Sequence, residues 1–162
     1  MSKLKYLIIH TTATEAGREV TSQEITDWHT NPPPRGRGWS RVGYSELFHL
    51  DGWIENLREY NHDDKVDGYE ITNGVRGVNG SSRHIVYSGG LIRGVATDTR
   101  TVDQFRSLKA YVTVFVARHR SILVAGHNQF SSKACPSFDV PAFCREIGIK
   151  ESNIYNPNQP NA

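Results

Sequence analysis

Two histidines and one cysteine stand at positions where a metal site can form. His10 ends a short apolar stretch, and His127 follows a second apolar stretch at residues 122–125. Because sites in open α/β sheets gather beyond the carboxyl ends of the strands, histidines placed there can converge. Cys135 follows in the next loop, directly before a proline. Two imidazoles and a thiolate form a ligand set suited to zinc, and three protein ligands leave a fourth position for water.

Each of these residues also has a plainer interpretation. A histidine at a strand end is more often a surface or hydrogen-bonded residue than a metal ligand. A lone cysteine is more often a small buried hydrophobe. The wide separation of His10 and His127 along the chain matches no local zinc-finger spacing. Residue types and spacing alone therefore leave both the metal site and the structural interpretation open.

The elements that must position these residues follow from hydrophobic periodicity and capping signals. Apolar runs predict strands at residues 4–9, 83–87 and 122–125. Thr21 and Thr101 each begin a capping box that predicts a helix. Asp51-Gly52 predicts a hairpin between residues 45–50 and 53–57, and residues 140–147 predict a closing helix with Gly148 as its C-cap. Elements mixed in this way predict an α/β fold with one central mixed sheet flanked by helices.

Length and composition fit a single domain. The chain has 162 residues, of which 37% are hydrophobic, and this suffices for one core. We expect the domain to cover residues 1–150. Residues 151–162 are rich in Asn, Pro and Gln and predict a polar tail outside the core. The glycine-containing stretch 62–82 predicts a long irregular loop, a kind of segment that is often functional.

Charge and hydropathy narrow the classes of function. The net charge is +2 and the Lys and Arg residues are dispersed, which disfavours nucleic-acid binding. The start of the chain carries an apolar run too short for a signal peptide, and no stretch reaches the length of a membrane span. We therefore expect cytoplasmic synthesis and no membrane association. Cys135 and Cys144 could close one short disulfide loop, but without a secretory signal this pairing has little support.

Nine short motifs stand out along the chain, and the similarity that they carry spans roughly residues 4–147. They are Ile8-Ile9-His10-Thr11-Thr12-Ala13-Thr14, Ile25-x-x-Trp28-His29, Gly38-Trp39-x-x-Val42-Gly43-Tyr44, Asp51-Gly52, Arg58, Gly77-Val78-Asn79, Gly89-Gly90, Gly126-His127 and Lys133-Ala134-Cys135-Pro136-Ser137-Phe138-Asp139. This series resembles the amidase-2 family, which includes phage lysozyme-type amidases and peptidoglycan recognition proteins. Several motifs in the same order are far more specific than any one of them.

The resemblance implies an activity and a set of site residues. The activity is N-acetylmuramoyl-L-alanine amidase, which hydrolyses the amide between N-acetylmuramic acid and L-alanine in peptidoglycan. The implied zinc ligands are His10, His127 and Cys135, and zinc lowers the pKa of a bound water to about 7. The resemblance also implies that Tyr44 and Lys133 assist catalysis. Lys133 is suited to steadying an oxyanion, and Tyr44 can orient water, donate a hydrogen bond or relay a proton.

The resemblance leaves two further functions to be weighed. The first is a recognition module that holds peptidoglycan without cutting it; loss of the cysteine ligand marks such members, so the presence of Cys135 favours an enzyme. The second is a regulator that binds another protein, as some phage lysozyme-type amidases do with RNA polymerase, and nothing in this chain specifically supports it. We expect a monomeric phage or prophage endolysin that another factor delivers to the cell wall.

Three segments depart from the family pattern. Tyr44-Ser45 stands where the family often has Tyr-His. Many members carry a His-Ala pair in the central loop, where this chain has Asn73-Gly74-Val75-Arg76, so a substrate-side histidine is absent. Arg83-His84 stands where the family tends to have Ile-Gly at the start of a strand. For His84 an edge position is expected in preference to one lining the site.

Overall fold

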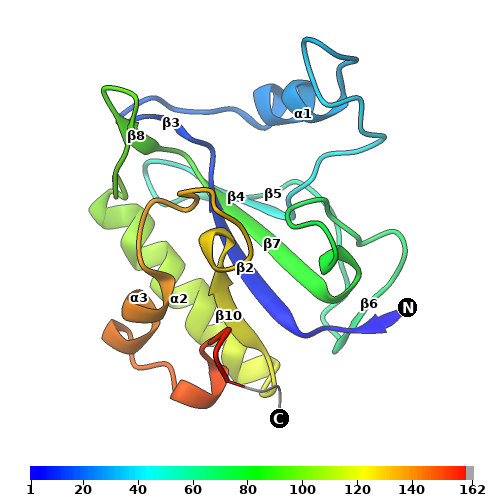
Figure 1. Ribbon diagram of the computed structural model, residues 1–162, viewed down its shortest axis with the longest axis vertical. Coiled ribbons are helices and arrows are strands. Elements are labelled where there is room, and N and C mark those ends of the chain that lie inside the picture. The colour runs from blue at the N-terminus through cyan, green and yellow to red at the C-terminus, as the bar shows by residue number, and fades with distance from the viewer. Residues whose placement is uncertain (160–162) are drawn as a thin grey trace.

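A five-stranded mixed sheet forms the centre of the computed structural model, which describes residues 1–159 (Figure 1). The order across this sheet is β10-β2-β7-β4-β5. All neighbouring pairs run parallel except β4 and β5, which are antiparallel. The α/β fold predicted from the sequence is thus confirmed. The five strands are β2 (Tyr6–Thr11), β4 (Glu46–Phe48), β5 (Ile54–Asn56), β7 (Ser82–Tyr87) and β10 (Leu123–Gly126).

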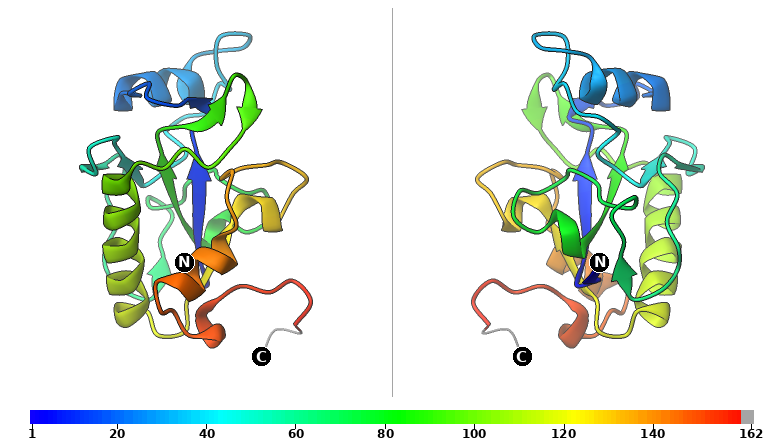
Figure 2. Two further views of the ribbon diagram at one scale, coloured as in Figure 1. Left: turned by 90° about the vertical axis from the view of Figure 1, so that its left-hand side faces the viewer. Right: turned by 90° about the vertical axis from the view of Figure 1, so that its right-hand side faces the viewer.

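The two faces of the sheet are covered differently. One face packs on α2 (Val102–Arg118) and α3 (Val140–Glu146) in the largest hydrophobic cluster, which includes Leu7 and Ile9 of β2. Figure 2 shows α2 along one side of the sheet and the loop after β10 on the opposite side. Because side chains alternate along a strand, Ile8 and His10 point to that opposite face. The chemistry-bearing face is therefore the one that α2 leaves open.

The helices begin where the capping signals predict. In α1 (Ser22–Thr30), the Thr21 side chain accepts from the Glu24 backbone and the Glu24 side chain accepts from the Thr21 backbone. Thr101 and Gln104 form the same reciprocal pair ahead of α2. Such a box satisfies two backbone donors that the first helical turn leaves free. Among the described residues, no helix combines the length and the hydropathy that crossing a membrane requires.

Several elements are too short for hydrophobic periodicity to predict them. Gly89 follows the strand predicted at residues 83–87 closely, and Gly90 already begins the next strand. Cys135 and Cys144 are both free, in agreement with the little support that a disulfide between them has in the sequence. The short elements are β1 (Ser2–Lys3), β3 (Thr14–Glu15), β6 (Lys65–Val66), β8 (Gly90–Ile92), β9 (Val95–Ala96), and the 3-10 turns η1 (Asn79–Ser81), η2 (His127–Gln129) and η3 (Glu151–Asn153).

The first residues of the segment after residue 150 pack against the domain. This corrects the prediction of a polar tail outside the core. Ile154 is only 4% exposed and belongs to the main cluster. The Tyr155 backbone N–H donates to Val124 O over 2.9 Å, and the Tyr155 ring stacks on Phe130. The composition concealed this because two apolar residues suffice to anchor the segment. The predicted tail residues 160–162 lie outside the described part of the chain.

Replacing Ile154 by alanine is expected to destabilise the fold. Removal of a buried aliphatic side chain costs about 2–5 kcal/mol in free energy of unfolding. Val114→Ala is the matched control, because Val114 is 59% exposed on α2 and surface changes usually stay within about 0.5 kcal/mol. Urea denaturation followed by circular dichroism measures both. Equal effects of the two substitutions would mean that the C-terminal segment does not support the core.

Candidate metal centre

Three residues distant in sequence meet at the open face of the sheet. His10 lies on β2, His127 begins η2 directly after β10, and Cys135 follows in the next loop. Strands β2 and β10 are parallel neighbours, with Gly126 opposite Ile9. One donor atom from each of the three residues lies within 4.8 Å of the others. The convergence that the sequence suggested is therefore present, and adjacent parallel strands produce it.

The donor set fits a zinc ion. His10 Nδ1 lies 3.7 Å from Cys135 Sγ. Bond lengths of about 2.0–2.1 Å to nitrogen and 2.3 Å to sulfur place a nitrogen and a sulfur about 3.6 Å apart on a tetrahedral zinc. The Thr11 backbone N–H also donates to Cys135 Sγ over 3.3 Å, and a donor aimed at the sulfur favours its thiolate form. Spacing and chemistry thus agree with a three-ligand zinc site.

The protonation of the three groups is governed by burial. Desolvation lowers the pKa of His10 well below its ordinary value, and the neighbouring His84 and His127 add to this. The pKa of His127 is lowered by burial and by Lys133. Burial raises the pKa of the Cys135 thiol to about 11, against the opposing effects of the Thr11 N–H and Lys133. Both imidazoles are therefore neutral with a free lone pair, whereas the thiol releases its proton readily only beside a cation.

Tyr44 lies next to the cluster, at the end of the loop from α1 to β4. Its ring centroid is 5.1 Å from that of His10 and 5.1 Å from that of His29. The His29 Nδ1 accepts from the Gly43 backbone N–H over 3.0 Å, which fixes the turn before Tyr44. Burial, followed by the charge of Cys135, raises the pKa of Tyr44. The phenol is thus protonated at neutral pH and can donate a hydrogen bond.

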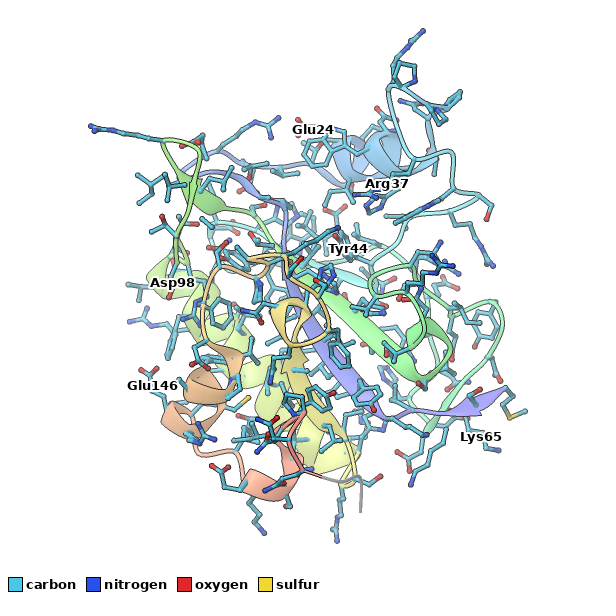
Figure 3. All side chains as sticks on the ribbon, viewed as in Figure 1. Glu24, Arg37, Tyr44, Lys65, Asp98 and Glu146 are labelled. Carbon is cyan, nitrogen blue, oxygen red and sulfur yellow. The ribbon has the colours of Figure 1, made fainter. Side chains whose placement is uncertain are left out.

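A cavity of about 590 Å³ opens over the cluster. Tyr44, His127 and Lys133 all line it, so the two predicted catalytic residues share one space with a predicted ligand. Arg37 and Arg76 line it as well, and Figure 3 labels Arg37 beside Tyr44. No carboxylate lies among its lining residues within the described chain. The cavity is therefore strongly cationic and suits an anionic ligand.

His84 corrects one expectation from the sequence. It lies on β7, the middle strand of the sheet, and is fully buried instead of lying at an edge. Its Nδ1 is 2.9 Å from His10 Nε2. Burial, with smaller effects of His127 and Arg83, lowers the pKa of His84 to about 3. Strand alternation contained the signal, because Ile85 and Tyr87 pack in the core and so turn His84 toward the opposite face.

Comparisons with known proteins agree with this arrangement. No protein-family model matches the chain. The endolysin of Escherichia phage T7 is 27% identical over 135 residues, which cover 83% of this chain and 81% of the relative. The endolysin of Klebsiella phage KP32 is 28% identical with the same coverage. Both matches therefore span most of this chain and most of each relative.

Solved structures share the fold at lower identity. The N-acetylmuramoyl-L-alanine amidase LysC from Clostridium intestinale superposes with a TM-score of 0.69 at 20% identity, covering 92% of this chain and 88% of the other. The Ph2119 endolysin from a Thermus scotoductus bacteriophage gives 0.68 at 22% identity, covering 93% and 88%. Drosophila PGRP-LB gives 0.65 at 22% identity, covering 84% and 76%. The chain has the fold that these amidases and recognition proteins share.

Proposed function

We propose that this chain is a zinc-dependent N-acetylmuramoyl-L-alanine amidase of the phage endolysin type. The observation that carries the proposal is the meeting of His10, His127 and Cys135, with donor atoms within 4.8 Å of one another, beside a cavity that His127 lines. The endolysin relatives and the amidase neighbours support the same activity. Zinc bound there supplies a Lewis acid and a water with lowered pKa.

The residues of the cavity account for binding of the substrate. The stem peptide of peptidoglycan carries carboxylates, and the cavity presents Arg37, Arg76 and Lys133 without a lining carboxylate. Trp39 adds a flat apolar wall, and the Arg37 guanidinium lies 5.2 Å from the centre of its ring. Cations that line the cavity favour an anionic peptide and hold it close to the cluster. Peptidoglycan is therefore the proposed substrate, and the proposed acting form is the monomer.

Tyr44 and Lys133 have separate roles in the proposed reaction. Tyr44 remains protonated, so its hydroxyl donates to the oxygen of the scissile carbonyl or orients the attacking water. Lys133 is exposed on the loop before Cys135 and brings a positive charge to the same space. A cation there stabilises the negative charge that develops on the carbonyl oxygen. Both groups act on the amide from the cavity side of the three-residue cluster.

Digestion of purified peptidoglycan tests the proposal. Mass spectrometry of the products should show free stem peptides that begin with L-alanine, together with glycan strands that carry intact lactyl groups. A chelator should abolish the release, and added zinc should restore it. A recognition module would instead sediment with the cell wall and release nothing. Products cleaved within the glycan or within the peptide would mean that the bond assignment is wrong.

A further inference from the structure

The two ring nitrogens of His10 have different partners. Nδ1 faces the cluster and lies 3.7 Å from Cys135 Sγ. Nε2 points away from the cluster and lies 2.9 Å from His84 Nδ1. A histidine that ligates a metal through one nitrogen needs a partner for the N–H on the other, because that hydrogen bond fixes the tautomer and the ring orientation. In this chain the partner is a second histidine.

We propose that His84 is a positioning residue for the metal centre: its Nδ1 accepts the Nε2 proton of His10 and so holds His10 Nδ1 toward the metal position. The inference rests on the proposed zinc site. A neutral imidazole has one donor and one acceptor nitrogen. If Nδ1 of His10 is the ligand, its proton is on Nε2, and the only role left to His84 Nδ1 at 2.9 Å is that of acceptor.

The strand register explains why the two rings meet. His84 on β7 lies opposite Ile8 on β2, two positions before His10 on the same face. The ring centroids of His10 and His84 are 5.1 Å apart. Both side chains are fully buried, so neither ring has room to turn toward solvent. The contact therefore joins two adjacent strands of the rigid sheet and involves no flexible loop.

The central loop makes room for the His84 ring. A Cβ at Gly74 would overlap the ring at Nδ1, Cγ and Cε1. Any side chain at position 74 would therefore displace the atom that accepts from His10. Glycine at this position leaves the imidazole the space that it occupies.

Across the described part of the chain, the other ring nitrogen of His84, Nε2, leaves the side chain with one hydrogen bond. Within residues 1–159, no protein atom forms a hydrogen bond with His84 Nε2, although that atom is buried. A buried polar atom without a protein partner is unfavourable. The contact with His10 is thus the one hydrogen bond of the His84 side chain that the described residues provide.

Zinc affinity of two His84 variants tests the inference. His84→Asn keeps an oxygen acceptor near the place of Nδ1, whereas His84→Leu fills much of the same space without an acceptor. Competition with a chromophoric chelator should show zinc affinity reduced about 10–100-fold in His84→Leu, and much of it retained in His84→Asn. Wild-type affinity in His84→Leu would overturn the proposal. So would an equal loss in both variants with unchanged metal-free melting temperatures.

A matched control and a second readout exclude a merely structural effect. Ser82 is a buried polar residue on the same strand and face, and its hydroxyl donates to Val78 O over 2.7 Å. Ser82→Ala removes that hydrogen bond and should leave zinc affinity unchanged. Long-range nitrogen–proton NMR spectra of the zinc-loaded wild type should place the His10 proton and the His84 proton on Nε2. A proton on His84 Nδ1 would show that the hydrogen bond runs the other way.

The outcomes separate this inference from the proposed function. If the wild type binds zinc in a His84-dependent manner but releases nothing from peptidoglycan, the proposed activity is wrong and the positioning role stands. If the wild type cleaves peptidoglycan and His84→Leu binds zinc normally, the activity stands and the positioning role is wrong. If Cys135→Ala binds zinc as well as the wild type does, both the proposed activity and the positioning role lose their basis.

Discussion

Cys135→Ala is expected to lose bound zinc and peptidoglycan hydrolysis together. The thiolate is one of only three protein donors in the cluster, and two imidazoles alone do not complete a catalytic zinc site. The rate should fall about a thousandfold or more, because metal activation supplies several kcal/mol of transition-state stabilisation. Elemental analysis of the purified variant measures zinc per chain, and release of stem peptides measures the rate.

Cys144→Ala is the matched control for this experiment. Cys144 is the other free cysteine, fully buried on α3 in the main hydrophobic cluster. Its loss removes a thiol from the same chain without touching the metal centre, so zinc content and rate should stay at wild-type levels. One zinc per chain retained in Cys135→Ala would show that the ligand set is wrong.

Lys133→Ala is expected to keep its zinc and lose most of its rate. Removing a group that stabilises a developing oxyanion typically costs about 10²–10³ in kcat. Because Lys133 is exposed, water screens its charge, and the effect must come from direct contact with the substrate. Kinetics with a soluble muropeptide should therefore show the loss in kcat, with elemental analysis showing unchanged zinc.

A control variant at an exposed lysine on the far face of the sheet separates a direct role of Lys133 in the reaction from the effect of a changed net charge. Lys109 lies on α2, away from the cavity, and Lys109→Ala changes the net charge by the same amount. Its kcat should match the wild type. An equal reduction in both variants would mean that Lys133 acts through long-range attraction of the anionic polymer and not at the reacting bond.

Sequence patterns predicted the parts of the fold that local physics determines. The capping boxes at Thr21 and Thr101 located two helix starts, since a capping side chain and its partner lie within one turn. Asp51-Gly52 located the β4–β5 hairpin for the same local reason. His10 and His127 could be placed together because His10 ends one apolar stretch and His127 follows another, and the carboxyl ends of parallel strands lie at the same edge of a sheet.

Contacts between segments far apart in the chain could not be predicted from sequence patterns. Nothing near Arg83-His84 indicates which strand will lie beside it, so the pairing of His84 with Ile8 and its contact with His10 could not be located. Ile154 lies in a polar stretch, and its burial follows from its parallel bridge with Val124 of the edge strand β10. Two-residue strands such as β3 and β9 are too short to show periodicity, and both form by pairing with β8.

The parallel pairing of β2 with β10 determines when, during synthesis of the chain, the three donor residues can come together. The first strand of the sheet supplies His10, and its edge neighbour, which precedes His127 and Cys135, is synthesised more than a hundred residues later. A nascent chain on the ribosome therefore holds an incomplete sheet and no assembled donor set until its last third has emerged. Such long-range closure is slow compared with local helix formation. Metal binding would then occur only once the sheet is complete, and the bound cation would link the early and late parts of the chain.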